Sequence, residues 1–210
     1  MAIGEAACVS VHGANRLGTN SLLDIVVFGR AAAHRAAETC TPGGATRSAP
    51  QAATDKALER FDRMRHAKGE TGAASIRLEM QQVMQKHAAV FRSSDSLTDG
   101  VRNMDQVAAQ MNDIGIKDQS LIWNTDLVEA MELENLMGQA LVTIRSADQR
   151  EESRGAHAHE DWPERDDENW MKHTVMWLDD NNQSRLDYRK VVMNTLSNDV
   201  APIPPAPRVY

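Results

Sequence analysis

The sequence predicts a mainly α-helical protein that ends in a β-hairpin and an extended tail. Between residues 53 and 150, apolar side chains recur every three or four positions, which is the spacing of one face of a helix. Before this stretch, a loop dense in His, Asn, Arg and Gly leads into an apolar helix. After it, two strand-like runs flank a turn of polar residues.

Composition limits the classes of protein to which the chain can belong. A length of 210 residues normally supplies one domain or one and a half. The 11 methionines and an aromatic share of 4% predict a helical core filled largely by Met. The net charge of −7 argues against a nucleic-acid surface, so we expect no nucleic-acid partner. Cys8 and Cys40 are too few for a disulfide framework or a zinc site, which favours a reducing compartment.

The sequence offers no membrane or export signal. No basic region followed by an apolar stretch occurs at the N-terminus, so we expect no signal peptide. The longest apolar run, around residues 22–28, is far too short to span a bilayer.

The N-terminal loop has the chemistry of an anion site. Residues 18–21 are turn and N-cap types, and a helix is predicted to start near Ser21. That helix end would carry unpaired N–H groups and a partial positive charge. The guanidinium of Arg16 can hold a carboxylate through two parallel hydrogen bonds, and His12 adds a donor or acceptor. Two interpretations stay open on these residues alone: a carboxylate or phosphate site, or an ordinary capped helix with a surface arginine.

Successive helices are predicted after a Gly- and Pro-rich linker. Leu58, Phe61 and Arg65 share one face of the first helix. The later helices carry apolar stripes, with His87 at the end of the second stripe. Their stripes are Ile76, Met80, Val83 and Met84; Leu97, Val101, Met104, Val107, Ala108 and Met111; and Leu127, Met131, Glu134, Met137, Leu141 and Ile144. Thr125 or Asp126 is expected to cap the longest helix. These segments predict a small helical bundle with Met in its core.

Histidines in the helical region and beyond are assigned to the surface rather than to a metal site. We expect His34, His66 and His87 at the surface or its boundary. A His-x-His pair with nearby carboxylates lies within residues 154–161 and could bind zinc, but this short pattern is common by itself. We therefore predict no metal site.

The C-terminal region is predicted to hold the hairpin. The runs 173–178 and 185–193 flank a polar turn and read as antiparallel strands. The acidic run 164–168 is expected to be a solvated loop anchored by Trp170, and the Pro-rich tail after Ala201 should be extended.

Three separated segments resemble the flavoprotein subunit of succinate dehydrogenase and fumarate reductase. They are His-Gly-Ala-Asn-Arg-Leu-Gly-Thr-Asn-Ser-Leu-Leu-Asp and its continuation to residue 30, residues 152–174, and residues 203–210. They occur in the order found in that family. Aspartate oxidase has a similar Arg-containing loop and a Ser-Arg-Gly segment, but residues 166–170 and the tail favour the succinate dehydrogenase branch.

This resemblance implies a division of the chain. Residues 1–40 would be a loop–helix remnant of an FAD-binding domain, and residues 41–52 a linker. Residues 53–150 would be the helical bundle domain of the flavoprotein C-terminal type. Residues 151–210 would form a loop-rich C-terminal region with the β-hairpin.

The resemblance also implies roles around the flavin and the substrate. Glu5, Ser21 and Leu22 match cofactor-binding positions for FAD, where a helix dipole would stabilise negative charge on the reduced flavin. Arg16 matches the arginine that binds a carboxylate of succinate or fumarate. The implied chemistry is hydride transfer from succinate to FAD, with electrons passing to an iron–sulfur subunit and quinone.

Four further residues are expected to be active-site neighbours: His12, Asn15, Arg154 and His157. His12 should shape the loop that carries Arg16 and should not be equated with the family's substrate-binding histidine. We assign no catalytic residue and no metal ligand within these 210 residues.

The sequence contains no Gly-x-Gly-x-x-Gly after a strand, so the dinucleotide-binding unit is not expected in it. In the family, the dinucleotide-binding unit lies N-terminal to the segments matched here. The histidine that attaches FAD covalently and the proton-shuttling arginine belong to that N-terminal part of the family's subunit. We therefore expect the isolated chain to be inactive, with Leu22, Ile25, Val26 and Phe28 exposed on its first helix.

The resemblance implies a peripheral location, attached through membrane anchor subunits, on the cytoplasmic side of a bacterial inner membrane or the mitochondrial matrix side. Two alternatives stay open. One is a non-catalytic helical module that docks on an iron–sulfur subunit or an assembly factor, and the other is part of an aspartate-oxidase-like flavoenzyme.

Overall fold

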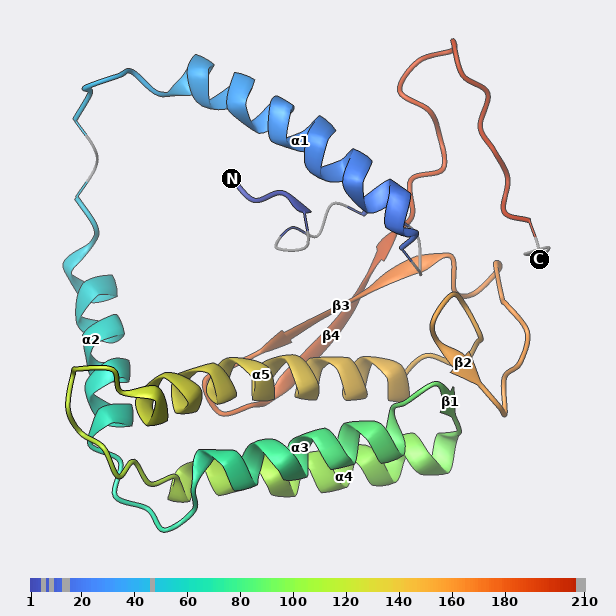
Figure 1. The fold of residues 1–210 in the computed structure, drawn as a ribbon. Coiled ribbons are helices and arrows are strands. Elements are labelled where there is room, and N and C mark those ends of the chain that lie inside the picture. Colours follow the sequence, from blue (N-terminus) through green and yellow to red (C-terminus); the bar gives the residue numbers. More distant parts are fainter. Residues whose placement is uncertain (5–6, 8–9, 13–15, 46–47, 207–210) are drawn as a thin grey trace.

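The computed structural model describes residues 1–4, 7, 10–12, 16–45 and 48–206. Within these residues the helices are α1 Gly18–Thr39, α2 Gln51–Arg65, α3 Ala73–His87, α4 Ser94–Ala109 and α5 Thr125–Asp148. A short 3-10 helix, Gln110–Asp113, continues α4. The strands are β1 Phe91–Arg92, β2 Ala158–His159, β3 Lys172–Leu178 and β4 Ser184–Lys190. The predicted mainly α fold with a C-terminal hairpin is confirmed (Figure 1).

Helices α3, α4 and α5 lie side by side and enclose the core (Figure 1). The side chains buried there are mostly aliphatic and sulfur-containing: Ile76, Met80, Leu97, Met104, Val107, Leu127, Leu133, Met137, Leu141 and Ile144. Burial of each such side chain contributes roughly 1.5–3 kcal/mol. The prediction that methionines fill the core is confirmed at Met80, Met104 and Met137.

A close contact between α3 and α4 depends on a glycine. A Cβ atom placed at Gly100 would lie 2.5 Å from His87 Cβ and 2.7 Å from Ile144 Cδ1. His87 is buried, so its assignment to the surface or its boundary is wrong, whereas His34 and His66 are exposed as expected. The imidazole can be buried because Nδ1 donates to the Ser96 carbonyl at 3.0 Å and Nε2 accepts from Asn103 at 3.2 Å.

Helix α2 rests on α5 by a face centred on Met64, which is shifted from the one predicted. Met64 is buried and Phe61 packs partly buried against the core, whereas Leu58 is 58% exposed, so the contact includes the predicted Phe61 but not Leu58. The orientation follows from an ion-pair cluster in which Arg60 Nε and Arg63 Nη2 reach the Glu134 carboxylate at 2.6 and 2.7 Å. This cluster also explains why an acidic residue occupies the stripe of α5.

The N-cap of α5 is Asn124 rather than Thr125 or Asp126. Its side-chain oxygen accepts from the Leu127 N–H at 2.9 Å, and its amide nitrogen donates to the Asp118 and Ser120 carbonyls. An N-cap must sit outside the helical backbone, and both predicted residues already lie inside it.

The C-terminal region is organised by two small strand pairs. Strands β3 and β4 are antiparallel in the register Lys172↔Lys190 to Leu178↔Ser184, and β3 packs on α5. The predicted hairpin is therefore confirmed. Strand β1 pairs in parallel with β2, which attaches the loop after α5 to the α3–α4 connection.

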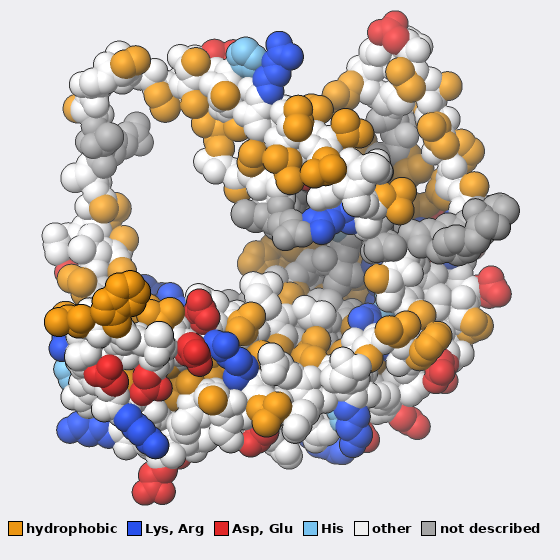
Figure 2. Space-filling view, viewed as in Figure 1, with side chains coloured by type: hydrophobic (Ala, Val, Ile, Leu, Met, Phe, Trp, Pro, Cys, Tyr) orange, Lys and Arg blue, Asp and Glu red, His pale blue; other side chains and the backbone are white. Residues whose placement is uncertain are grey.

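Helix α1 lies apart from the three packed helices, across the hairpin from them (Figure 1). Figure 2 shows hydrophobic side chains along its surface, and Leu22, Leu23, Val26 and Val27 are each more than half exposed. Ile25 is 44% exposed and Phe28 is half-buried. None of the helices in the described residues is long and apolar enough to cross a membrane.

Candidate functional site

The start of α1 is the first candidate site. The helix begins at Gly18, three residues before the predicted start, because Leu17 is extended and its carbonyl accepts from the Ser21 N–H at 3.1 Å. Ser21 is therefore inside the first turn and its N–H is occupied. The N–H groups of residues 18–20 precede this bond and have no partner within the helix.

Arg16 lies in the exposed segment immediately before this helix end. Ser21 is half-buried and Leu22 is 65% exposed, one after the other in the helix. The structure thus brings Arg16, Ser21 and Leu22 to one end of α1. Glu5 and Asn15, which were also assigned here, fall outside the described residues.

His12 contacts α1 through a residue that sequence reasoning missed. Its Nε2 lies 2.9 Å from Oδ2 of Asp24, whose side chain is 5% exposed. Asp24 is the one buried residue in the described part of α1. In the sequence it is a single acid inside an apolar run, a signal that could have drawn attention to it.

The N-terminal segment is supported on two sides. Ile3 packs against α1 where a Cβ at Gly29 would come within 3.2 Å of its Cδ1 atom. On the other side, Arg189 of β4 donates a hydrogen bond to the Ser10 hydroxyl. The hairpin therefore contacts the N-terminal segment at Ser10.

Glu152 is the centre of a second cluster, in the loop after α5. It is 0% exposed, and its Oε1 accepts from Arg150 Nη2 at 2.5 Å and from Arg154 Nε at 2.8 Å. Its Oε2 accepts from Arg154 Nη2 at 2.9 Å and from the Asp166 N–H at 3.0 Å. Burial raises the pKa of Glu152, but the bonds from Arg154, Asp166 and Arg150 outweigh burial and leave the pKa below its ordinary value. The carboxylate is thus held ionised.

His157 lies in the same cluster, and its protonation is set by its partners. Nε2 lies 2.9 Å from the Arg150 carbonyl, which can only accept, so Nε2 carries the proton. Nδ1 then accepts from Arg92 Nη1 at 2.8 Å. Burial lowers the pKa of His157, and the charge of Arg92 lowers it further. Both ring nitrogens are therefore used by the protein's own groups.

The Arg154 guanidinium is likewise bonded to groups of the protein itself. Besides its two bonds to Glu152, its Nη2 donates to the Asp167 carboxylate at 2.7 Å and the Asp166 carbonyl at 3.2 Å. Arg154 and His157 thus hold the C-terminal loop together. Sequence reasoning missed Glu152, although an acid flanked by arginines two positions away on each side is a readable signal.

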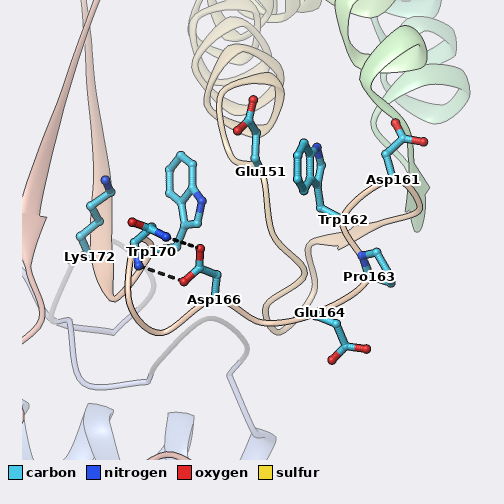
Figure 3. Close-up of a pocket in the computed structure, with 9 residues that line it drawn as sticks. Glu151, Asp161, Trp162, Pro163, Glu164, Asp166, Trp170 and Lys172 are labelled. Carbon is cyan, nitrogen blue, oxygen red and sulfur yellow. Dashed lines mark hydrogen bonds between the residues drawn. The ribbon is translucent and has the colours of Figure 1, made fainter.

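An open pocket of about 560 Å³ lies beside this cluster (Figure 3). It has indole and carboxylate walls, formed by Glu151, Asp161, Trp162, Pro163, Glu164, Asp166, Asn169, Trp170 and Lys172. Lys172 Nζ lies 4.6 Å from the Trp170 ring centroid, and Arg150 lies 5.3 Å from it. Trp170 anchors the acidic loop by these contacts, as predicted.

Comparisons with known proteins show the family to which the chain belongs. Residues 77–210 match the family described as "Fumarate reductase flavoprotein C-term". The chain is 54% identical to the succinate dehydrogenase flavoprotein subunit of Rickettsia conorii, covering 100% of this chain and 35% of that relative. It is 52% identical to the mitochondrial succinate dehydrogenase [ubiquinone] flavoprotein subunit of Oryza sativa subsp. japonica, covering 100% of this chain and 33% of that relative. A solved quinol fumarate reductase chain of E. coli superposes with a TM-score of 0.86 at 35% identity, over 100% of this chain and 35% of that one.

The helical bundle with its C-terminal hairpin thus has the fold of the C-terminal part of flavoprotein subunits. This chain belongs to the succinate dehydrogenase/fumarate reductase flavoprotein family, as its sequence resemblance implied. It spans about 35% of the length of the relatives that it matches. These relatives do not favour the interaction-module or aspartate-oxidase alternatives.

Proposed function

We propose that this chain supplies the carboxylate-binding arginine and part of the FAD pocket to a subunit that oxidises succinate to fumarate. The observation that carries the proposal is the position of Arg16 directly before the N-terminus of α1. This arrangement combines a guanidinium fork with a helix end whose first N–H groups have no partner within the helix. Such a site favours a dicarboxylate and an electron-rich ring side by side.

The groups at the start of α1 fit a flavin. The N–H groups of residues 18–20 and the positive end of the helix dipole favour a carbonyl-rich ring edge that gains negative charge on reduction. When bound, FAD supplies the acceptor for the hydride of succinate. Ser21 and Leu22 remain the predicted contacts on this helix, and Glu5 remains the predicted contact in the segment before it.

The chain's own residues would act by binding and orientation. Arg16 would hold one carboxylate of the substrate in a fixed plane through two hydrogen bonds. The helix end would stabilise negative charge nearby. The base that removes the substrate proton and the covalent FAD attachment residue would come from the rest of the subunit, so we expect these 210 residues alone to be inactive.

Partners follow from the same proposal. The exposed aliphatic residues of α1 suit burial against the remainder of the FAD-binding domain, and the complete subunit would pass electrons to an iron–sulfur subunit. Membrane anchor subunits would then hold the complex on the cytoplasmic side of a bacterial inner membrane, or the matrix side in mitochondria.

Arg16→Lys in the complete subunit tests the proposal. Lysine keeps the charge but loses the bidentate geometry, so we expect a loss of roughly 2–3 kcal/mol in carboxylate binding, which is about a 30- to 150-fold weaker affinity for succinate. The affinity is measured by steady-state kinetics together with malonate titration of the flavin absorbance. Arg35→Lys on the exposed face of α1 is the matched control, since the Arg35 side chain pairs only with Glu38 in the described contacts. Unchanged affinity in the Arg16 variant contradicts the assignment.

A further inference from the structure

We propose that His12 and Asp24 are positioning residues, which together fix the loop that presents Arg16 to the substrate. The inference rests on the proposed role of Arg16 and adds to it a pair of residues that do not touch the substrate. It is carried by the 2.9 Å contact between His12 Nε2 and Asp24 Oδ2, and by the low exposure of the two side chains, 17% and 5%.

The residue that α1 buries is an acid, Asp24, although the helix carries many aliphatic side chains. Leu22, Leu23 and Val26 are 65%, 62% and 69% exposed, while the residue between them that is turned inward is an acid at 7%. Its second oxygen, Oδ1, is buried without a hydrogen-bond partner among the described residues. Burying a carboxylate in this way costs free energy unless its charge and hydrogen bonds are satisfied. The pair therefore has a purpose other than hydrophobic burial.

Arg16 lies in the sequence between the two residues of the pair. His12 and Asp24 are twelve residues apart, and Arg16 lies between them. Their contact closes a short loop around Arg16, which removes conformational freedom that the exposed segment would otherwise keep. A guanidinium that must meet a carboxylate in one plane gains from this restriction, because less entropy is lost on binding.

The contact also fixes the tautomer of His12. An ionised carboxylate can only accept, so Nε2 of His12 carries a proton and donates it to Asp24. In the neutral ring, Nδ1 is then a hydrogen-bond acceptor. Asp24 thus sets both the direction and the hydrogen-bonding character of the imidazole, as an orienting carboxylate does for histidines in other sites.

The test compares Asp24→Ala, Asp24→Asn and His12→Ala in the complete flavoprotein subunit. The asparagine side chain keeps an acceptor of the same shape, so Asp24→Asn should retain most of the function that Asp24→Ala loses. We expect Asp24→Ala and His12→Ala each to weaken malonate binding about tenfold, with bound FAD unchanged and kcat less affected than KM. Glu38→Ala, which breaks an exposed ion pair on the same helix, is the matched control and should change nothing.

A double-mutant cycle with Arg16→Lys separates this inference from the proposed function. If the pair acts through Arg16, the effect of His12→Ala should largely disappear in the Arg16→Lys background. Equal effects in both backgrounds would overturn the positioning role while leaving Arg16 assigned. An ineffective Arg16→Lys would instead overturn the proposed function. His12→Ala leaves the sequence of α1 unchanged, so it tests the inference even if Asp24→Ala fails to fold.

Discussion

At the scale of single residues, two carboxylates are buried in the described part of the chain, and they differ in their hydrogen-bond partners. Glu152 is surrounded by donors from Arg150, Arg154 and the Asp166 backbone. Asp24 has one donor, His12, among the described residues. A buried carboxylate whose oxygens all accept hydrogen bonds stabilises a loop, whereas one with an oxygen left without a hydrogen bond lowers the stability of the fold. The first pattern therefore indicates a structural role and the second a role at a site.

Glu152→Gln should destabilise the C-terminal region strongly. The substitution leaves two guanidinium groups facing a neutral amide, and breaking a buried ion pair costs about 3–5 kcal/mol of unfolding free energy. The lowered pKa of Glu152 gives the wild type stability that is present above the ordinary value of 4.5 and is lost as pH falls through the folded-state pKa. Urea denaturation at pH 7 and pH 4 should thus show a smaller difference between wild type and variant at pH 4. Glu151→Gln, at an exposed position, is the control. If Glu152→Gln lowered the free energy of unfolding no more than Glu151→Gln does, Glu152 would not stabilise the C-terminal region.

At the scale of elements, two helical glycines differ in their surroundings: one lies in a close helix contact and the other faces open space. Gly100 on α4 faces His87 and Ile144, whereas a Cβ at Gly138 on α5 would meet no atom within 4 Å. Both are glycines inside helices, where alanine is intrinsically favoured by about 1 kcal/mol. The sign of a substitution should therefore depend on packing alone.

Gly138→Ala should raise the free energy of unfolding by about 0.5–1 kcal/mol, while Gly100→Ala should lower it by about 1–3 kcal/mol. The added methyl group at position 100 would lie 2.5 Å from His87 Cβ, and backbone must move to relieve that contact. Chemical denaturation of both variants under one set of conditions measures the difference. A Gly100→Ala variant at least as stable as the wild type would contradict the close packing of α3 and α4, and a destabilised Gly138→Ala would contradict the open surroundings of Gly138.

The elements themselves were largely predictable. Apolar spacing located α3, α4 and α5, and a polar turn located the hairpin, because both signals are local. The start of α1 and the cap of α5 were predicted wrongly, and the buried face of α2 was predicted only at Phe61. Each depends on backbone conformation or on a contact with a distant residue. Leu17 is extended, Asn124 donates to the Asp118 carbonyl, and Glu134 pairs with two arginines of α2.

At the scale of the whole molecule, the residues assigned to the site divide into two groups. Arg16, Ser21 and His12 are on or before α1, and Arg154 and His157 are in the loop after α5. Residue types and resemblance assign both groups to the site, and their roles there stay predictions. Asp24, which contacts His12, and Glu152, which contacts Arg154, could not be assigned because their roles arise from burial, and periodicity does not report burial for a single acid.

Exposure on α1 predicts how the isolated chain behaves. Leu22, Leu23, Val26 and Val27 form an apolar surface on one helix, and such surfaces drive association of chains at micromolar to millimolar concentration. The chain should therefore show concentration-dependent self-association in sedimentation velocity. The double variant Leu22→Lys/Val26→Lys places two charges one turn apart on that surface and should shift the protein to monomer.

The same pair of substitutions should leave thermal unfolding unchanged, since both side chains are at least 65% exposed. Val192→Lys/Leu196→Lys is the matched control, because these residues of the segment after β4 are 82% and 107% exposed and their substitution leaves α1 unchanged. Association that persists in the α1 variant and disappears in the control would place the interacting surface on that segment. Loss of association in the α1 variant alone means that α1 carries an interface for another folded surface, which the proposed function assigns to the rest of the FAD-binding domain.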